Sequence, residues 1–79
     1  MVDVKKAAIA AGLVWGSGIF LAGLVGAATG SYAADFIDAM GSLYPGYTST
    51  YVGAFIGLIW GILDGGIAGG LVAYIYNKL

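Results

Sequence analysis

Two long apolar stretches, separated by a more polar segment, dominate the pattern of hydrophobic and polar positions along this chain. The first stretch carries no charged residue, and the second carries one, Asp64. A helix needs about 20 predominantly apolar residues to cross the hydrocarbon core of a bilayer. The pattern therefore predicts an all-α membrane protein, a single antiparallel hairpin over residues 1–79. Its transmembrane helices are expected at about 7–30 and 50–77, with a connection at about 31–49.

The connection has a helical pattern of its own, followed by a turn. Apolar and polar residues take different faces at helical spacing: Phe36, Ile37, Met40 and Leu43 on one, Asp35, Asp38 and Ser42 on another. This pattern predicts a short helix in the membrane interface. In the segment 44–47, Pro45 presets the backbone and Gly46 accepts a positive φ, which is typical of a β-turn. An irregular loop is the alternative for the short helix.

A cleaved signal peptide is the competing interpretation of the first stretch. Lys5 and Lys6 would form its basic region, and Ser31-Tyr32-Ala33, with small residues at its first and last positions, would form its cleavage site. The apolar run, however, is much longer than the roughly 7–15 residues of a signal core. Its length favours a retained transmembrane helix.

Charge placement predicts the orientation of the hairpin. Lys5 and Lys6 precede the first helix and Lys78 ends the second, whereas the connection carries only Asp35 and Asp38. Basic residues remain on the cytoplasmic side of a membrane. We therefore expect a protein integral to the cell membrane with both termini cytoplasmic. Tyrosine rings favour the headgroup level and are expected at the outer boundary (Tyr32, Tyr44, Tyr47 and Tyr51) and the inner one (Tyr74 and Tyr76).

Composition supports membrane insertion and narrows the possible chemistry. Of 79 residues, 61% are hydrophobic and only 9% are charged, against about 25% charged in an average soluble domain. The chain contains no Cys, His, Arg or Glu, so thiolate and imidazole chemistry is excluded. We expect neither an enzyme nor a bound metal or cofactor. A net charge of −1 also provides no basic patch for nucleic acid.

Glycine spacing indicates close helix packing. Small residues let helix backbones approach each other in lipid, where no hydrophobic force drives association. One row lies in each predicted helix: Gly12, Gly16, Gly23, Gly26 and Gly30 in the first, and Gly53, Gly57, Gly61, Gly65 and Gly69 in the second. These rows either pack the hairpin against itself or join copies of the chain. Gly66 and Gly70 widen the second row, which favours homo-oligomers.

Asp64 is the one charged residue deep within either predicted helix, near mid-bilayer, and it falls on the glycine side of its helix. Acidic residues inside membranes usually face partners or water. Asp64 then lines a polar or water-filled path, or is protonated and hydrogen-bonds a neighbouring helix, with Ser17 as a possible partner. A third alternative is that the function of Asp64 is to bind and release a proton.

Several segments together resemble a known group of proteins. They are Gly12–Gly16, Leu43–Tyr47, Gly53–Gly57, Trp60-Gly61 with Asp64-Gly65, and Ala73–Asn77. These segments, which extend over nearly the whole chain, are similar to those of small two-span archaeal and bacterial membrane proteins labelled as bacteriophage holins. The resemblance implies a membrane-permeabilising protein that accumulates, oligomerises and forms or gates a pore or lesion.

Two other classes of membrane protein share parts of this hairpin architecture. The rotor-ring proteolipid of ATP synthases is also a two-helix hairpin with a mid-membrane acid, but its connection is a polar Arg-Gln-Pro loop. The connection here is acidic and contains no Arg, which argues against rotor docking. A structural or accessory subunit of a larger membrane assembly or viral envelope is the other alternative.

Overall fold

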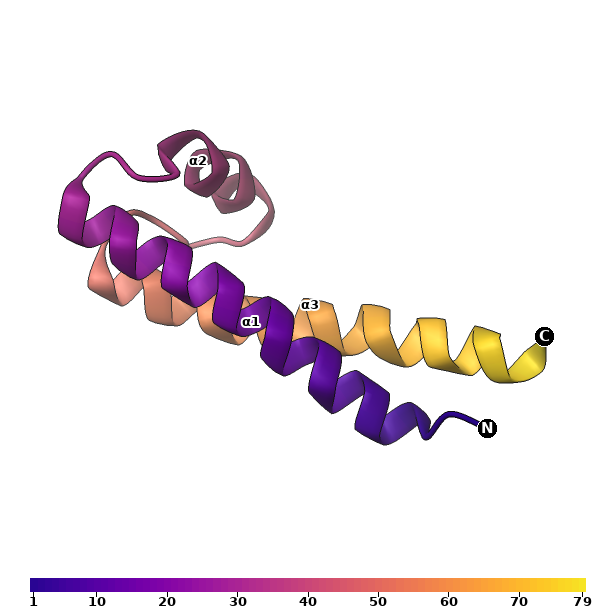
Figure 1. Cartoon of the computed structure of the whole chain (residues 1–79). Coiled ribbons are helices and arrows are strands. Elements are labelled where there is room, and N and C mark those ends of the chain that lie inside the picture. Colours follow the sequence, from indigo (N-terminus) through magenta and orange to yellow (C-terminus); the bar gives the residue numbers. More distant parts are fainter.

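The chain folds as two long antiparallel helices with a short helix between them. The computed structural model describes residues 1–79 and contains α1 (Val4–Thr29), α2 (Ala34–Leu43) and α3 (Tyr51–Lys78). Both chain ends lie at the same end of the hairpin (Figure 1). The structure confirms the predicted all-α hairpin with a short helix in its connection.

Local capping fixes where the long helices begin and end. The Asp3 carboxylate accepts a hydrogen bond from the backbone N–H of Lys6 at 3.0 Å. The cap lets α1 begin at Val4, three residues before the start predicted from hydropathy alone. The Thr50 hydroxyl accepts from Gly53 N at 2.9 Å and caps α3 in the same way. Gly30 ends α1 in the left-handed conformation, with φ 77°.

Both long helices have the length and composition of membrane-spanning segments. α1 contains 26 residues and α3 contains 28, which makes them about 40 Å long at the rise of an α-helix. The hydrocarbon core of a bilayer is about 30 Å thick. In a bilayer, helices of this length would reach beyond the core into the headgroup layers or tilt within it.

The surface between α1 and α3 consists largely of glycine. The buried residues of α1 are Gly12, Gly16, Ile19, Gly23 and Gly26, and those of α3 are Gly53, Ala54, Gly57, Gly61, Gly65 and Ala73. A Cβ atom added to Gly61 would lie 2.7 Å from the Cα atom of Gly16. The two backbones are therefore in direct contact where these glycines meet, which is the packing that small residues permit.

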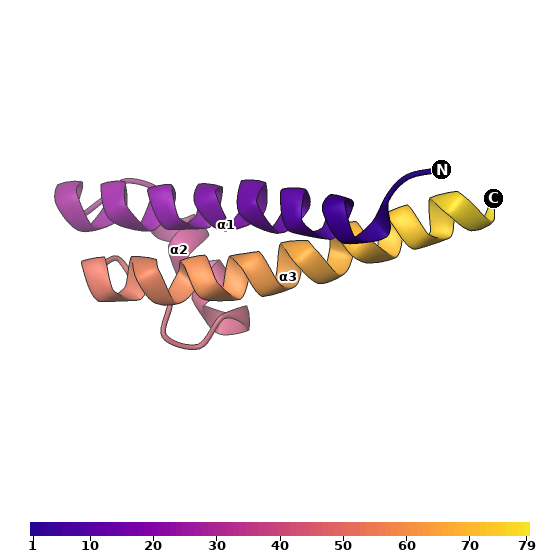
Figure 2. The same cartoon turned by 90° about the horizontal axis from the view of Figure 1, so that it is seen from below.

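The connection folds back over one flank of the hairpin. α2 lies across the hairpin near the end where the chain reverses (Figures 1 and 2). Its Ile37 side chain is buried with Ile19 of α1, Tyr44 and Tyr47, and this cluster is the largest apolar core of the molecule. Tyr47 also donates a buried hydrogen bond to the carbonyl of Ile19 at 2.7 Å. The connection is thus part of the packed structure.

The structure adds one detail about the connection and corrects one prediction. Ile37 and Met40 pack against the core, but Phe36 and Leu43, expected on the same face, are exposed. Tyr44 and Tyr47, expected at the outer membrane boundary, are instead buried core residues. The reason is that α2 carries the chain toward the middle of the hairpin and the following residues run back along α3 to its start, which helical periodicity alone does not reveal.

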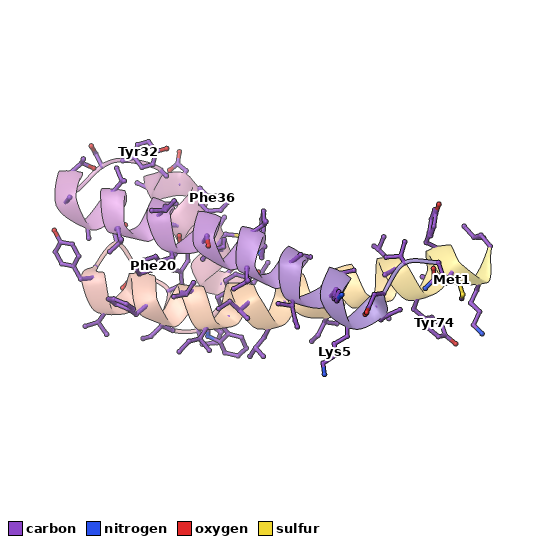
Figure 3. The ribbon with its side chains drawn as sticks, turned by 60° about the horizontal axis from the view of Figure 1, so that its bottom comes forward. Met1, Lys5, Phe20, Tyr32, Phe36 and Tyr74 are labelled. Atoms are coloured by element: carbon purple, nitrogen blue, oxygen red, sulfur yellow. The ribbon has the colours of Figure 1, made fainter.

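The opposite end of the hairpin is closed by a contact between the two termini. Asn77 accepts a hydrogen bond from Val2 N at 2.9 Å and donates one to Val2 O at 2.6 Å. Met1, Lys5 and Tyr74 lie at this end, whereas Tyr32 and Phe36 lie at the other (Figure 3). The hairpin is therefore fixed at both ends as well as along its glycine surface.

Candidate functional site

Asp64 lies halfway along α3, as the fourteenth of its 28 residues. Its neighbours Gly61 and Gly65 are buried against α1, but Asp64 itself is exposed on the flank of the hairpin. The carboxyl group is thus beside the helix interface and not within it. A helix position one residue away from a close backbone contact turns its side chain outward by about 100°.

A chain of two hydrogen bonds joins this carboxyl group to the other helix. Trp15 of α1 donates its Nε1–H to the Tyr44 hydroxyl oxygen at 2.9 Å. Tyr44 in turn donates its hydroxyl hydrogen to Oδ2 of Asp64. The Tyr44 hydroxyl therefore connects α1, the connection and α3 at one point, and its donor and one acceptor position are both used.

Aromatic packing and a turn hold Tyr44 in this position. Its ring is stacked on that of Trp60, with centroids 6.2 Å apart and planes 8° from parallel. Trp60 donates its Nε1–H to Pro45 O at 2.9 Å. The structure contains the turn expected at 44–47, because Tyr47 N donates to Tyr44 O at 3.0 Å and Gly46 has φ 91°. The turn directs the Tyr44 side chain back toward α3.

The environment keeps the Tyr44 hydroxyl protonated. Burial raises the pKa of Tyr44 above its ordinary value, and the hydrogen bond to Asp64 raises that pKa further. The Trp15 hydrogen bond acts in the opposite direction but is a smaller influence. Tyr44 is therefore a hydrogen-bond donor to Asp64 at neutral pH.

Two grooves meet at Asp64. The larger has a volume of about 450 Å³ and lies between the end of α2 and α3, lined by Leu43, Tyr44, Trp60, Leu63, Asp64 and Ile67. The smaller, about 280 Å³, is lined by Ala11, Trp15, Asp64, Gly65, Ala68, Gly69 and Val72. Asp64 supplies the charged group of both. Its Oδ1 atom has no hydrogen-bond partner within the chain, since Tyr44 binds Oδ2.

Ser17 is not part of this site. The hydrogen bond proposed between Ser17 and Asp64 is absent, because Asp64 bonds to Tyr44 instead. Ser17 is exposed on α1, next to the buried Gly16. The two residues lie at comparable distances along the hairpin, but the close contact of the glycine surfaces turns the Ser17 side chain away from α3.

The predicted glycine rows are covered by other residues of the same chain. An added Cβ would meet Ile62 at Gly12 and Gly16, Ala54 at Gly23, Ile37 at Gly26, Thr48 at Gly53, Tyr47 at Gly57, Gly16 at Gly61, Trp15 at Gly65 and Ala11 at Gly69. Gly66 and Gly70 also face α1, at Ala8. The breadth of the second row is therefore explained by α1 of the same chain, which covers Gly66 and Gly70 as well as Gly65 and Gly69. Gly30 was wrongly placed in the first row: it ends α1, and a Cβ added there would meet no atom within 4 Å.

Sequence reasoning missed the aromatic residues around Asp64. Trp15 and Tyr44 are 29 residues apart, and Tyr44 and Asp64 are 20 apart. No periodicity links positions on three separate elements, so their meeting depends on how the connection folds back. The turn at 44–47 was a usable signal, because it reverses the chain directly beside Tyr44.

Comparisons with protein-family models, with curated proteins and with solved structures found no match for this chain.

Proposed function

We propose that this chain is a holin-like integral membrane protein that assembles with copies of itself to form or gate a pore or lesion. In this assembly the flank that carries Asp64 faces a shared polar path. The observation that carries the proposal is the exposed carboxyl group midway along a helix that is otherwise apolar on this side.

In a membrane, the flank that carries Asp64 would face lipid if no other copy of the chain covered it. Leu63 and Ile67 beside Asp64 are 54% and 65% exposed, which is ordinary for side chains that face lipid. A charged carboxyl group at the centre of a membrane costs about 2.5 kcal/mol or more. Tyr44 supplies one hydrogen bond, and no cationic side chain lies in either helix interior. Water or polar groups shared between protomers would remove the remaining cost.

The surface used for assembly differs from the one expected from the glycine rows. Those glycines are covered by the same chain, so a second copy would reach them only by separating the hairpin. We place the contact between protomers on the outer faces beside the Asp64 flank. We also propose that the end carrying Lys5, Lys6 and Lys78 is cytoplasmic.

Conductance of purified protein in planar bilayers tests this function. We expect wild-type protein to conduct and Asp64→Asn to change its ion selectivity, because the variant loses the negative charge of the carboxylate but retains a hydrogen-bond acceptor for Tyr44. Asp38→Asn, which removes an exposed acid of α2, is the matched control and should leave selectivity much closer to wild type. Wild-type protein that never conducts would overturn the pore and leave a structural subunit as the better explanation.

A further inference from the structure

The larger groove beside Asp64 has the size and walls of a small-molecule site. Pockets for small ligands usually have volumes of about 300–1,000 Å³ and are mainly apolar with few polar groups. This groove has a volume of about 450 Å³, and five of its six lining residues are hydrophobic. A transmembrane helix of a partner protein would need a far longer surface than these six residues provide.

The polar group in the groove selects for positive charge. The Asp64 carboxyl group is the one carboxylate in the lining, and its Oδ1 atom is left without a partner. The lining contains no cation that would attract an anion. A single carboxyl group is also a poor metal site, because hard cations such as Ca²⁺ take six to eight oxygen ligands.

The aromatic walls add a second preference. Tyr44 and Trp60 both line the groove, and their positions are fixed by their stacking and by the Trp60 hydrogen bond to Pro45. Aromatic rings attract organic cations through the negative charge of their faces. The remaining walls, Leu43, Leu63 and Ile67, favour a hydrocarbon body.

We propose that this groove binds an apolar organic monocation, a protonated amine whose ammonium group pairs with Oδ1 of Asp64 and whose hydrocarbon part contacts Leu63 and Ile67. The site is complete within one protomer, so it does not depend on the proposed pore. If the pore exists, the bound amine would lie at the wall of its path. Binding without conductance would retain this inference and remove only the pore.

Fluorescence in lipid nanodiscs tests the proposal, with 1-adamantylamine as the probe and 1-adamantanol as its uncharged analogue of the same shape. The chain contains two Trp residues; Trp60 lines the groove and Trp15 is hydrogen-bonded to Tyr44. Tryptophan emission therefore reports directly on this site, after subtraction of a titration with protein-free nanodiscs. We expect saturable amine binding at least tenfold tighter than binding of the alcohol.

Three variants complete the experiment. Asp64→Asn should weaken amine binding at least tenfold and leave the alcohol unaffected, whereas Asp38→Asn, outside the groove, should change neither. Ile67→Trp should block the groove while keeping the carboxyl group, and the exposed position of Ile67 accommodates the larger side chain. This variant adds a third tryptophan, so its amine binding is measured by competition with a radiolabelled probe. Amine binding that persists in either Asp64→Asn or Ile67→Trp, or equal binding of the amine and the alcohol to wild type, would overturn the proposal.

Discussion

Three glycines show how differently one residue type acts in this chain. Gly61 contacts the backbone of Gly16 and has no room for a side chain. Gly30 has open space around it but a φ of 77°, which L-residues with a Cβ atom rarely adopt. Gly18 has neither constraint, because it is within α1 and nothing lies within 4 Å of an added Cβ. Space and backbone conformation therefore restrict different positions.

Alanine substitutions at these three positions should give three different results. Gly18→Ala should stabilise the protein by about 0.5–1 kcal/mol, since Ala restricts the unfolded chain and favours helix. Gly30→Ala should destabilise it by about 1–2 kcal/mol through backbone strain, and Gly61→Ala by about 1–3 kcal/mol through overpacking. Thermal unfolding in detergent, followed by circular dichroism, measures all three. An equal effect of Gly18→Ala and Gly61→Ala would contradict the packing described.

At the scale of elements, the Tyr44 hydroxyl is the main polar link between the connection and the two long helices. Tyr44→Phe keeps the ring stacked on Trp60 but leaves the Trp15 N–H and the Asp64 carboxyl group without this partner. Hydrogen bonds to charged groups contribute about 1.5–3 kcal/mol. We expect α2 to open more often, with amide exchange of α2 roughly tenfold faster or more.

Tyr32→Phe is the matched control for this prediction. The Tyr32 side chain is exposed and its hydroxyl makes no hydrogen bond within the chain. Hydrogen–deuterium exchange with mass spectrometry should therefore show unchanged protection of α2 in this variant. If Tyr44→Phe and Tyr32→Phe exchange at the same rate as wild type, the hydroxyl does not hold the connection in place.

At the scale of the whole molecule, the orientation in the membrane can be tested with single cysteines, since the chain has none. Ser42 is exposed on α2, and Leu79 is 99% exposed beyond the end of α3. We expect an impermeant thiol reagent to label Ser42→Cys on intact cells and Leu79→Cys only after the cells are permeabilised. Labelling of Leu79→Cys alone on intact cells would reverse the orientation, and labelling of both would exclude a two-span hairpin.

The extent to which the sequence predicts this structure depends on how far apart the interacting residues are in the chain. Hydropathy predicts both long helices, and regular spacing places Gly12, Gly16 and Gly23 on one face, because periodicity is a local property. The same spacing does not say whether that face meets the same chain or another copy. It also does not bring Tyr44 to Asp64, because that contact requires the fold of the whole connection.

The position of Tyr44 in the chain has a consequence for biosynthesis. Trp15, Tyr44 and Asp64 are made in this order, and the hydrogen bonds run in the same order from donor to acceptor. The acidic residue is thus synthesised last, when its donor is already present on the preceding segment of the same nascent chain. If α3 crosses a membrane, its acidic residue would find a hydrogen-bond donor in its own upstream sequence, and no second polypeptide would have to supply one.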